Sequence, residues 1–268
     1  MFPILLKFKT PDFLRFILPD FISLYSYGLF IGLGIVSCYL IVYQKTKNLG
    51  INKDNLSELF IWSFVAAFAG GKLLFFIETP AKYFGEPSLM LKNIGSGFVF
   101  YGSLIFVIPT MIFWLRKNKI PVISFFDGLA WGAPVLHSFG RIGCFMAGCC
   151  HGKVCNNFMG VTFSHPESAA SPLNSPLYPT QLFDIAVNLI ALLVIYFFSK
   201  KQKFGGQLFL VYLIIYAAGR IIIENFRGDD DRGFLFNKTL SYSQFIALLL
   251  ILGSVSVWVF LFKKIKQN

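Results

Sequence analysis

The chain has 268 residues, of which 56% are hydrophobic and only 14% are charged. A soluble domain of ordinary composition has about 25% charged residues, so this composition excludes an ordinary water-soluble protein. The formal net charge is +11, but many basic residues stand in short loops beside apolar segments. That placement favours contact with anionic lipid and predicts no nucleic-acid partner.

Long apolar segments follow one another along the chain. A helix that crosses a bilayer needs about 20 mostly apolar residues. Seven segments approach this length: 20–43, 56–79, 97–115, 122–140, 180–199, 206–225 and 240–262. Basic residues follow the first, third, fifth and seventh segments, which predicts that these ends face the cytoplasm. We therefore expect an all-α polytopic membrane protein with one integral membrane domain over 1–268, seven transmembrane helices, an external N-terminus and a cytoplasmic C-terminus.

Two stretches lie outside these segments. Residues 1–19 combine three prolines with aromatic residues, which favours an amphipathic lead-in at the membrane interface. Residues 152–179 contain four prolines and form the one longer loop, on the predicted external side. This loop is too short for a separate domain, and we expect it to form a lid or a flap that faces the substrate.

Ionisable residues inside apolar segments indicate function or internal pairing, because burial of a charge in lipid is costly. They are Lys72, Glu78, Asp127, Arg141, Asp184, Arg220 and Glu224. The spacing of Arg220 and Glu224 places them on one helix face, either as an ion pair that fixes packing or as a group that binds a lipid phosphate. Arg141 has no acidic residue within one turn, which favours binding of an anionic ligand there.

The densest group of reactive residues runs from His137 to Gly152. If one helix continues through it, His137 and Arg141 lie one turn apart on the same face. A neutral imidazole could then act as a general base while the guanidinium holds an anion.

This segment resembles the signature of bacterial prolipoprotein diacylglyceryl transferases. Further motifs resemble that family in the same order over about residues 20–262. They are Tyr25-Ser-Tyr27-Gly28-Leu29, Gly70-Gly71-Lys72, Tyr101-Gly102-Ser103-Leu104, Tyr178-Pro179-Thr180-Gln181-Leu182-Phe183-Asp184 and the segment from Tyr216 to Arg227.

The resemblance implies a transferase of lipoprotein biosynthesis. It would move the diacylglyceryl group of phosphatidylglycerol to the lipobox cysteine of a prolipoprotein signal peptide, with formation of a thioether and release of glycerol phosphate. The resemblance also implies a multi-pass protein of the bacterial cytoplasmic (inner) membrane, surrounded by membrane lipids, and it implies no cofactor or metal ion. By position in the motifs, the catalytic candidates are Arg141, Arg220, Tyr101 and His137. The substrate-binding candidates are Tyr27, Gly102, Gly143, Cys144, Cys149, Gly152, Gln181 and Glu224.

Several residues depart from the family pattern. Tyr101 and Tyr178 stand where the family has histidine, and Cys144 and Cys149 stand where it has asparagine and glutamate. A phenol with a pKa of about 10 is a poor base at neutral pH, so His137 or His151 could take the base role instead.

Four cysteines gather within the twelve residues from Cys144 to Cys155, with His151 among them. They could be small residues at helix contacts, a disulfide, a zinc site or a redox centre. For zinc, the spacing is a loose fit and the adjacent pair Cys149–Cys150 is an awkward geometry. The sequence therefore leaves two other hypotheses open: a diverged relative that uses these thiols on another substrate, and a non-enzymatic scaffold or carrier.

Overall fold

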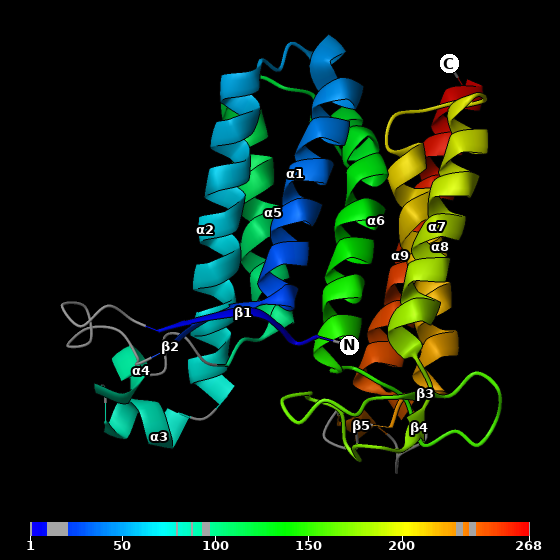
Figure 1. Ribbon diagram of the computed structural model, residues 1–268. Coiled ribbons are helices and arrows are strands. Elements are labelled where there is room, and N and C mark those ends of the chain that lie inside the picture. The colour runs from blue at the N-terminus through cyan, green and yellow to red at the C-terminus, as the bar shows by residue number, and fades with distance from the viewer. Residues whose placement is uncertain are drawn as a thin grey trace. The chain divides into compact units, whose positions relative to one another are not determined.

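The computed structural model describes residues 2–9, 21–78, 80–86, 88–92, 97–228, 233–235 and 240–267. Most of these residues are helical, as Figure 1 shows. The chain divides into two compact units, one made of 1–42 and 126–268 and the other of 43–125. The single domain expected over 1–268 stays a prediction.

The first unit is a group of long helices with short antiparallel strand pairs (Figure 1). Its helices are α1 (Ser26–Thr46), α6 (Val122–Ala147), α7 (Thr180–Ser199), α8 (Gln207–Glu224) and α9 (Tyr242–Gln267), the ends of α1 and α6 extending into the other unit. Its strand pairs are β1 (Ile4–Lys9) with β2 (Phe21–Tyr25), β3 (Val161–Thr162) with β4 (Pro176–Leu177), and β5 (Phe234–Leu235) with β6 (Leu240–Ser241).

A buried apolar cluster joins α6, α7 and α8. Its fully buried members include Ala130 of α6 and Ala191 and Ile195 of α7. Leu208 and Val211 of α8 pack against them. Alanine at these contacts lets the helices approach closely, which strengthens van der Waals packing where water supplies little driving force.

The second unit holds the other helices: η2 (Lys47–Leu49), α2 (Lys53–Glu78), α3 (Pro80–Gly85), α4 (Ser88–Lys92) and α5 (Phe100–Lys117). Glycines bring α2 and α5 together, because a Cβ added at Gly70 would meet the carbonyl oxygen of Gly102 and the side chain of Phe106. Beside this contact, the buried Lys72 donates a hydrogen bond of 2.8 Å to the carbonyl oxygen of Gly97. The glycines of two family-like motifs thus serve helix packing.

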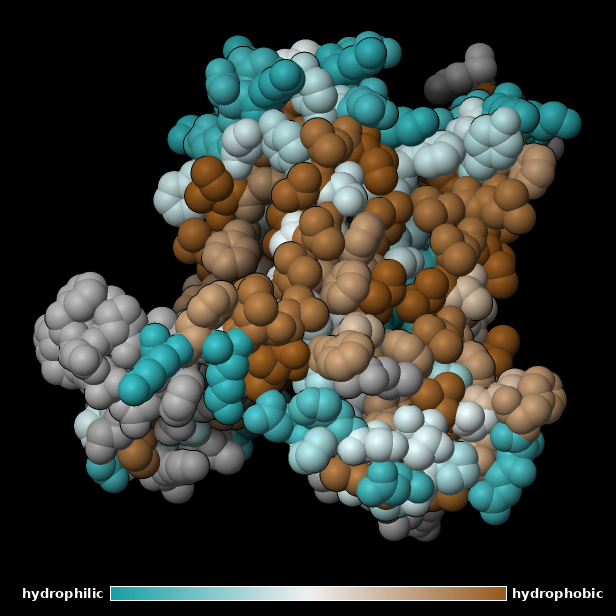
Figure 2. Space-filling model, viewed as in Figure 1, coloured by the Kyte–Doolittle hydropathy of each residue, from teal (hydrophilic) through white to brown (hydrophobic). Residues whose placement is uncertain are grey.

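Five helices of the described chain are long and apolar enough to cross a membrane: Ser26–Leu49, Lys53–Glu78, Thr180–Ser199, Gln207–Glu224 and Tyr242–Ile265. Large apolar side chains are exposed along them, for example Phe64 on α2 and Leu252 on α9. Figure 2 shows hydrophobic residues along the helix flanks of each unit and hydrophilic residues at helix ends. Exposed apolar surface of this extent is typical of helices that face lipid.

Each of the seven predicted spans contains a helix, but the first begins later than expected. Residues 21–25 form β2, which pairs with β1, and α1 starts only at Ser26. The Ser26 hydroxyl and backbone N–H both bond to the Pro3 carbonyl oxygen, at 3.1 and 3.0 Å. Within the predicted lead-in, residues 4–9 are therefore a strand, and residues 10–19 lie outside the described part of the chain.

The buried Asp127 of α6 caps the start of α8. Its carboxylate accepts backbone hydrogen bonds from Gly206 at 2.6 Å, Leu208 at 2.9 Å and Phe209 at 3.2 Å. The Gln202 amide donates a fourth, at 2.7 Å. The first N–H groups of a helix lack partners within the helix and attract negative charge. Asp127 is thus one of the in-span ionisable residues that serve internal pairing.

We expect Asp127→Asn to destabilise the protein by about 1–3 kcal/mol, because the amide loses the charge and turns a donor toward backbone donors. The thermal unfolding midpoint in detergent measures this effect. Asp54→Asn is the matched control, since Asp54 is exposed in the first turn of α2 and should shift stability by less than about 0.5 kcal/mol. Equal midpoints for the two variants would contradict the cap.

The loop 152–179 has a packed core of its own. Phe163, Ala170 and Leu177 are buried together, and Phe145 at the end of α6 packs against them. Backbone hydrogen bonds also join the two ends of the loop. The Gly152 N–H donates to the Tyr178 carbonyl oxygen at 2.7 Å, and the Tyr178 N–H donates to the Lys153 carbonyl oxygen at 3.0 Å. This loop is a folded substructure, and its role as a lid stays a prediction.

Candidate functional site

Arg141 lies at the centre of a buried polar cluster in the first unit. Its Nε atom is 3.0 Å from Oδ2 of Asp184, which belongs to α7. The same Nε donates to Nε2 of His137 at 3.3 Å. No acidic residue lies within one turn of Arg141 on its own helix, as the sequence indicated, but α7 supplies an acidic partner that an argument from one helix turn does not reach.

Arg220 pairs with the acid one turn later on its own helix. Its Nη2 atom is 3.0 Å from Oε2 of Glu224 and donates to the Ser243 hydroxyl of α9 at 3.2 Å. Its Nη1 atom is buried and has no hydrogen-bond partner among the residues that the structure describes. The ion pair predicted as one alternative thus exists, and one face of the guanidinium is still available for a ligand oxygen.

The two arginines belong to one electrostatic group. Among the guanidinium groups, Arg141 has the strongest electrostatic interaction with the Asp184 carboxylate, followed by Arg220 and Arg227. Three guanidinium groups therefore lie near one another, with the carboxylates of Asp184 and Glu224 beside them. Guanidinium groups gathered in this way can bind a phosphodiester through charge-assisted hydrogen bonds.

His137 orients Arg141 in this arrangement. Because its Nε2 accepts a hydrogen bond from Arg141, the lone pair of that nitrogen is already used. The imidazole ring also packs against Tyr216, with ring centroids 5.2 Å apart. Its predicted base role would require this hydrogen bond to break.

His151 is held by the long loop. The Ser171 N–H donates to its Nε2 at 3.1 Å, so Nδ1 carries the proton and donates to the Gly152 carbonyl oxygen at 2.9 Å. Both ring nitrogens therefore have backbone partners. This geometry gives His151 a role in loop structure, and the base role again requires a rearrangement.

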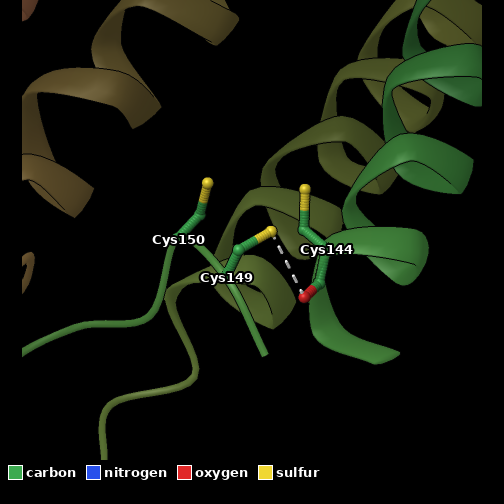
Figure 3. Close-up of side chains that lie close together, drawn as sticks. All are labelled: Cys144, Cys149 and Cys150. Carbon is green, nitrogen blue, oxygen red and sulfur yellow. Dashed lines mark hydrogen bonds between the residues drawn. The ribbon is translucent and has the colours of Figure 1, made fainter. Parts of the chain in front are cut away.

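The end of α6 and the following turn gather three thiols (Figure 3). The sulfur atoms of Cys144, Cys149 and Cys150 all lie within 4.8 Å of one another, and all five cysteines of the chain have free thiols. Hydrogen bonds from the two neighbouring thiols lower the pKa of Cys150, and guanidinium charges add to this shift. The surroundings of Cys150 thus favour its thiolate form.

The other candidates of the first unit surround this cluster. A Cβ added at Gly143 would lie 3.1 Å from the Tyr27 ring, so that glycine admits α1 against α6. Tyr27 is 45% exposed and lies within electrostatic reach of Arg141. Gly152 sits where a Cβ would meet the Phe226 carbonyl oxygen, and the buried Gln181 donates to the Cys149 carbonyl oxygen at 2.7 Å.

Tyr101 and Gly102 lie on α5, in the second unit. Tyr101 is 40% exposed, and Gly102 packs against Gly70. Their roles in a shared site stay predictions.

Sequence reasoning noted Asp184, Arg227 and Cys150 but did not place them among the catalytic or substrate-binding candidates. Asp184 stood in a family-like motif and inside an apolar segment, which was a usable signal. Arg227 forms a β-bridge with Gly152 and is buried, a pairing between residues far apart in the sequence. Only the folded chain brings these residues together.

Comparison with known proteins agrees with this geometry. The sequence profile described as prolipoprotein diacylglyceryl transferase matches residues 15–260. The chain belongs to the prolipoprotein diacylglyceryl transferase family. The resemblance predicted from the motifs is thereby confirmed.

Curated relatives share this family over most of their length. The chain is 34% identical to phosphatidylglycerol–prolipoprotein diacylglyceryl transferase 2 of Clostridium perfringens over 237 residues, covering 88% of this chain and 91% of the relative. It is 34% identical to the Clostridium tetani transferase over 239 residues, covering 89% and 93%. A transferase of Dehalococcoides mccartyi is 28% identical over 243 residues, covering 90% and 91%. Nothing in these comparisons favours a different enzyme of this family that uses its thiols on another substrate.

Proposed function

We propose that this chain is a phosphatidylglycerol–prolipoprotein diacylglyceryl transferase. It moves the diacylglyceryl group of phosphatidylglycerol to the cysteine thiol of a lipobox peptide, forms a thioether and releases glycerol phosphate. The observation that carries the proposal is family membership over residues 15–260, with relatives at 34% identity that are named for this reaction.

The arginine cluster supports this chemistry. Negative charge grows on the phosphate as its bond to the diacylglyceryl carbon breaks, and preorganised donors stabilise such a charge in a site that excludes water. Arg141 and Arg220 supply the guanidinium groups, and Arg220 keeps Nη1 for a phosphate oxygen. We assign Asp184 and Glu224 to hold these guanidinium groups in place before the lipid arrives.

The remaining candidates receive roles by their places around the cluster. Tyr27, Gly143, Cys144, Cys149, Gly152 and Gln181 line the region between the start of α1, the end of α6 and the start of α7, and we propose that they bind substrate. We propose that Tyr101 and Gly102 contribute from α5, with the Tyr101 phenol as a hydrogen-bond donor rather than a base.

We also propose the membrane arrangement. Seven helices, α1, α2, α5, α6, α7, α8 and α9, span the bacterial inner membrane as one integral membrane domain. Basic residues after α1, α5, α7 and α9 indicate that these ends are cytoplasmic, which leaves the N-terminus and the loop 152–179 outside. Signal peptides of prolipoproteins would then reach the site from the membrane.

A transfer assay with purified protein tests the function. The protein in phosphatidylglycerol micelles is incubated with a lipobox peptide, and mass spectrometry follows the thioether product. We expect product with the cysteine peptide and phosphatidylglycerol, and none with a cysteine-to-serine peptide or with phosphatidylcholine alone. Absence of product from folded protein would refute the proposed reaction.

A further inference from the structure

The three thiols at the end of α6 have the geometry of a metal site. A tetrahedral zinc ion with Zn–S bonds of about 2.3 Å holds its sulfur ligands roughly 3.8 Å apart. The sulfur atoms of Cys144, Cys149 and Cys150 lie within 4.8 Å of one another, so small side-chain rotations would bring them to this spacing. In Figure 3 the side chains of Cys144 and Cys150 extend in the same direction, and that of Cys149 turns toward Cys144.

The backbone resolves the difficulty of adjacent cysteines. In a strand, consecutive side chains point to opposite faces, which would separate Cys149 from Cys150. Here Cys150 has φ 60 and Gly148 has φ 78, so the chain turns on both sides of Cys149. A left-handed conformation is unfavourable for a residue with a Cβ, so contacts around Cys150 must hold it in this conformation. It keeps both sulfur atoms in the group with Cys144.

Hydrogen bonds from α7 hold this turn in place. The Thr180 hydroxyl donates to the Cys150 carbonyl oxygen at 2.6 Å, and the Gln181 amide donates to the Cys149 carbonyl oxygen at 2.7 Å. Thr180 and Gln181 are both buried. Contacts of this kind, one shell outside the ligands, orient metal ligands and maintain affinity.

The local charge also suits a divalent ion with three thiolates. Zn²⁺ with three thiolates carries a formal charge of 2 − 3 = −1, which needs compensation in a buried position. Arg141 and Arg227 both act on Cys150 electrostatically and supply that positive charge. A monovalent ion would leave −2, so the surroundings favour a divalent thiophilic ion.

We infer that Cys144, Cys149 and Cys150 bind one zinc ion and leave its fourth position open to the thiol of the acceptor peptide. A site with three protein ligands and one open position is the arrangement of catalytic zinc. The binding of the acceptor thiol at the fourth position rests on the proposed transferase function. Zinc bound there would activate this thiol, a role that His137 does not fill while its Nε2 accepts a hydrogen bond from Arg141.

The step balances without a redox partner. The peptide thiol binds the zinc ion and loses its proton to water, since a coordinated thiol is deprotonated. The sulfur then forms a bond to the terminal diacylglyceryl carbon while the bond from that carbon to the phosphate oxygen breaks. Glycerol phosphate leaves with the electron pair beside the arginines, the thioether dissociates from zinc, and zinc remains divalent.

Metal analysis of purified protein tests the site. Protein prepared without chelators is passed through a desalting column and its zinc is measured by mass spectrometry. We expect about one zinc ion per chain in wild type and in Cys155→Ser, and less than a tenth of that in Cys149→Ser and Cys150→Ser. Cys155→Ser is the matched control, because Cys155 lies outside the cluster and serine can keep its hydrogen bond to Asn157.

Cobalt gives a second readout that does not depend on activity. Cobalt bound to thiolates should produce a strong near-ultraviolet band in wild type and Cys155→Ser, and the lipobox peptide should shift the visible bands. Wild-type zinc no higher than in Cys149→Ser, or a metal-free wild type with two cluster cysteines in a disulfide, would overturn the site. Undiminished transfer by metal-free protein would overturn the thiol-activating role. Zinc-loaded, cobalt-competent wild type without any transfer would instead refute the proposed transferase function and leave the metal site established.

Discussion

Arg141→Lys should lower kcat/KM for diacylglyceryl transfer by about 100-fold or more, the loss typical of removing one preorganised donor to a developing negative charge. Lysine keeps a positive charge opposite Asp184, which lies 3.0 Å from Arg141 in the native chain. It lacks the planar fork that can bind Asp184, His137 and a phosphate oxygen together. The expected loss is therefore one of activity more than of stability.

The measurement is the initial rate of thioether formation over a range of phosphatidylglycerol concentrations. The thermal unfolding midpoint of each preparation shows that the variant is folded. Arg116→Lys is the matched control, since Arg116 is exposed in the last turn of α5 and should transfer at the wild-type rate. Wild-type transfer by Arg141→Lys would remove Arg141 from the catalytic group.

Replacing Arg220 and Glu224 singly and together tests whether this ion pair serves helix packing or catalysis. Loss of one member of a buried ion pair destabilises a protein by about 3–5 kcal/mol, whereas an apolar replacement of both members is often neutral. We expect Arg220→Met and Glu224→Leu each to lower the unfolding midpoint, and the double variant to recover most of it. We also expect the double variant to stay at least about 100-fold less active than wild type, because it lacks the Arg220 guanidinium that we propose to bind the phosphate.

The two measurements on this series separate the two interpretations of the pair. Recovery of stability together with activity would mean that the pair only fixes the packing of α8. Recovery of stability alone supports phosphate binding by Arg220. We expect recovery of stability alone, because the buried Nη1 of Arg220 has no hydrogen-bond partner among the residues that the structure describes.

The family could be recognised from the sequence because its motifs are local strings in a constant order. The helices could be placed because about 20 apolar residues in a row have few other stable arrangements. All seven predicted segments contain a helix, including α5 and α6, whose sequences hold Pro109 and Pro134. The start of the first helix was misplaced, because strand pairing between β1 and β2 depends on residues about 20 positions apart.

The site was predicted less completely, and the reason is the same throughout. An argument from helix periodicity finds partners three or four residues away, such as Arg220 and Glu224. It cannot find Asp184, which reaches Arg141 from α7, or the backbone N–H groups of α8 that surround Asp127. It also gave no sign of the left-handed backbone of Cys150, which keeps both adjacent sulfur atoms in one group with Cys144.

The sequence by itself determined the lipid surroundings, the helices and the family of this protein, since apolar segments and motifs are local patterns that do not depend on contacts between distant residues. The tertiary structure alone decided which charges meet, which histidine nitrogens are already engaged and which thiols face one another. Those contacts depend on the packing of helices far apart in the chain, and such tertiary context routinely overrides local preference.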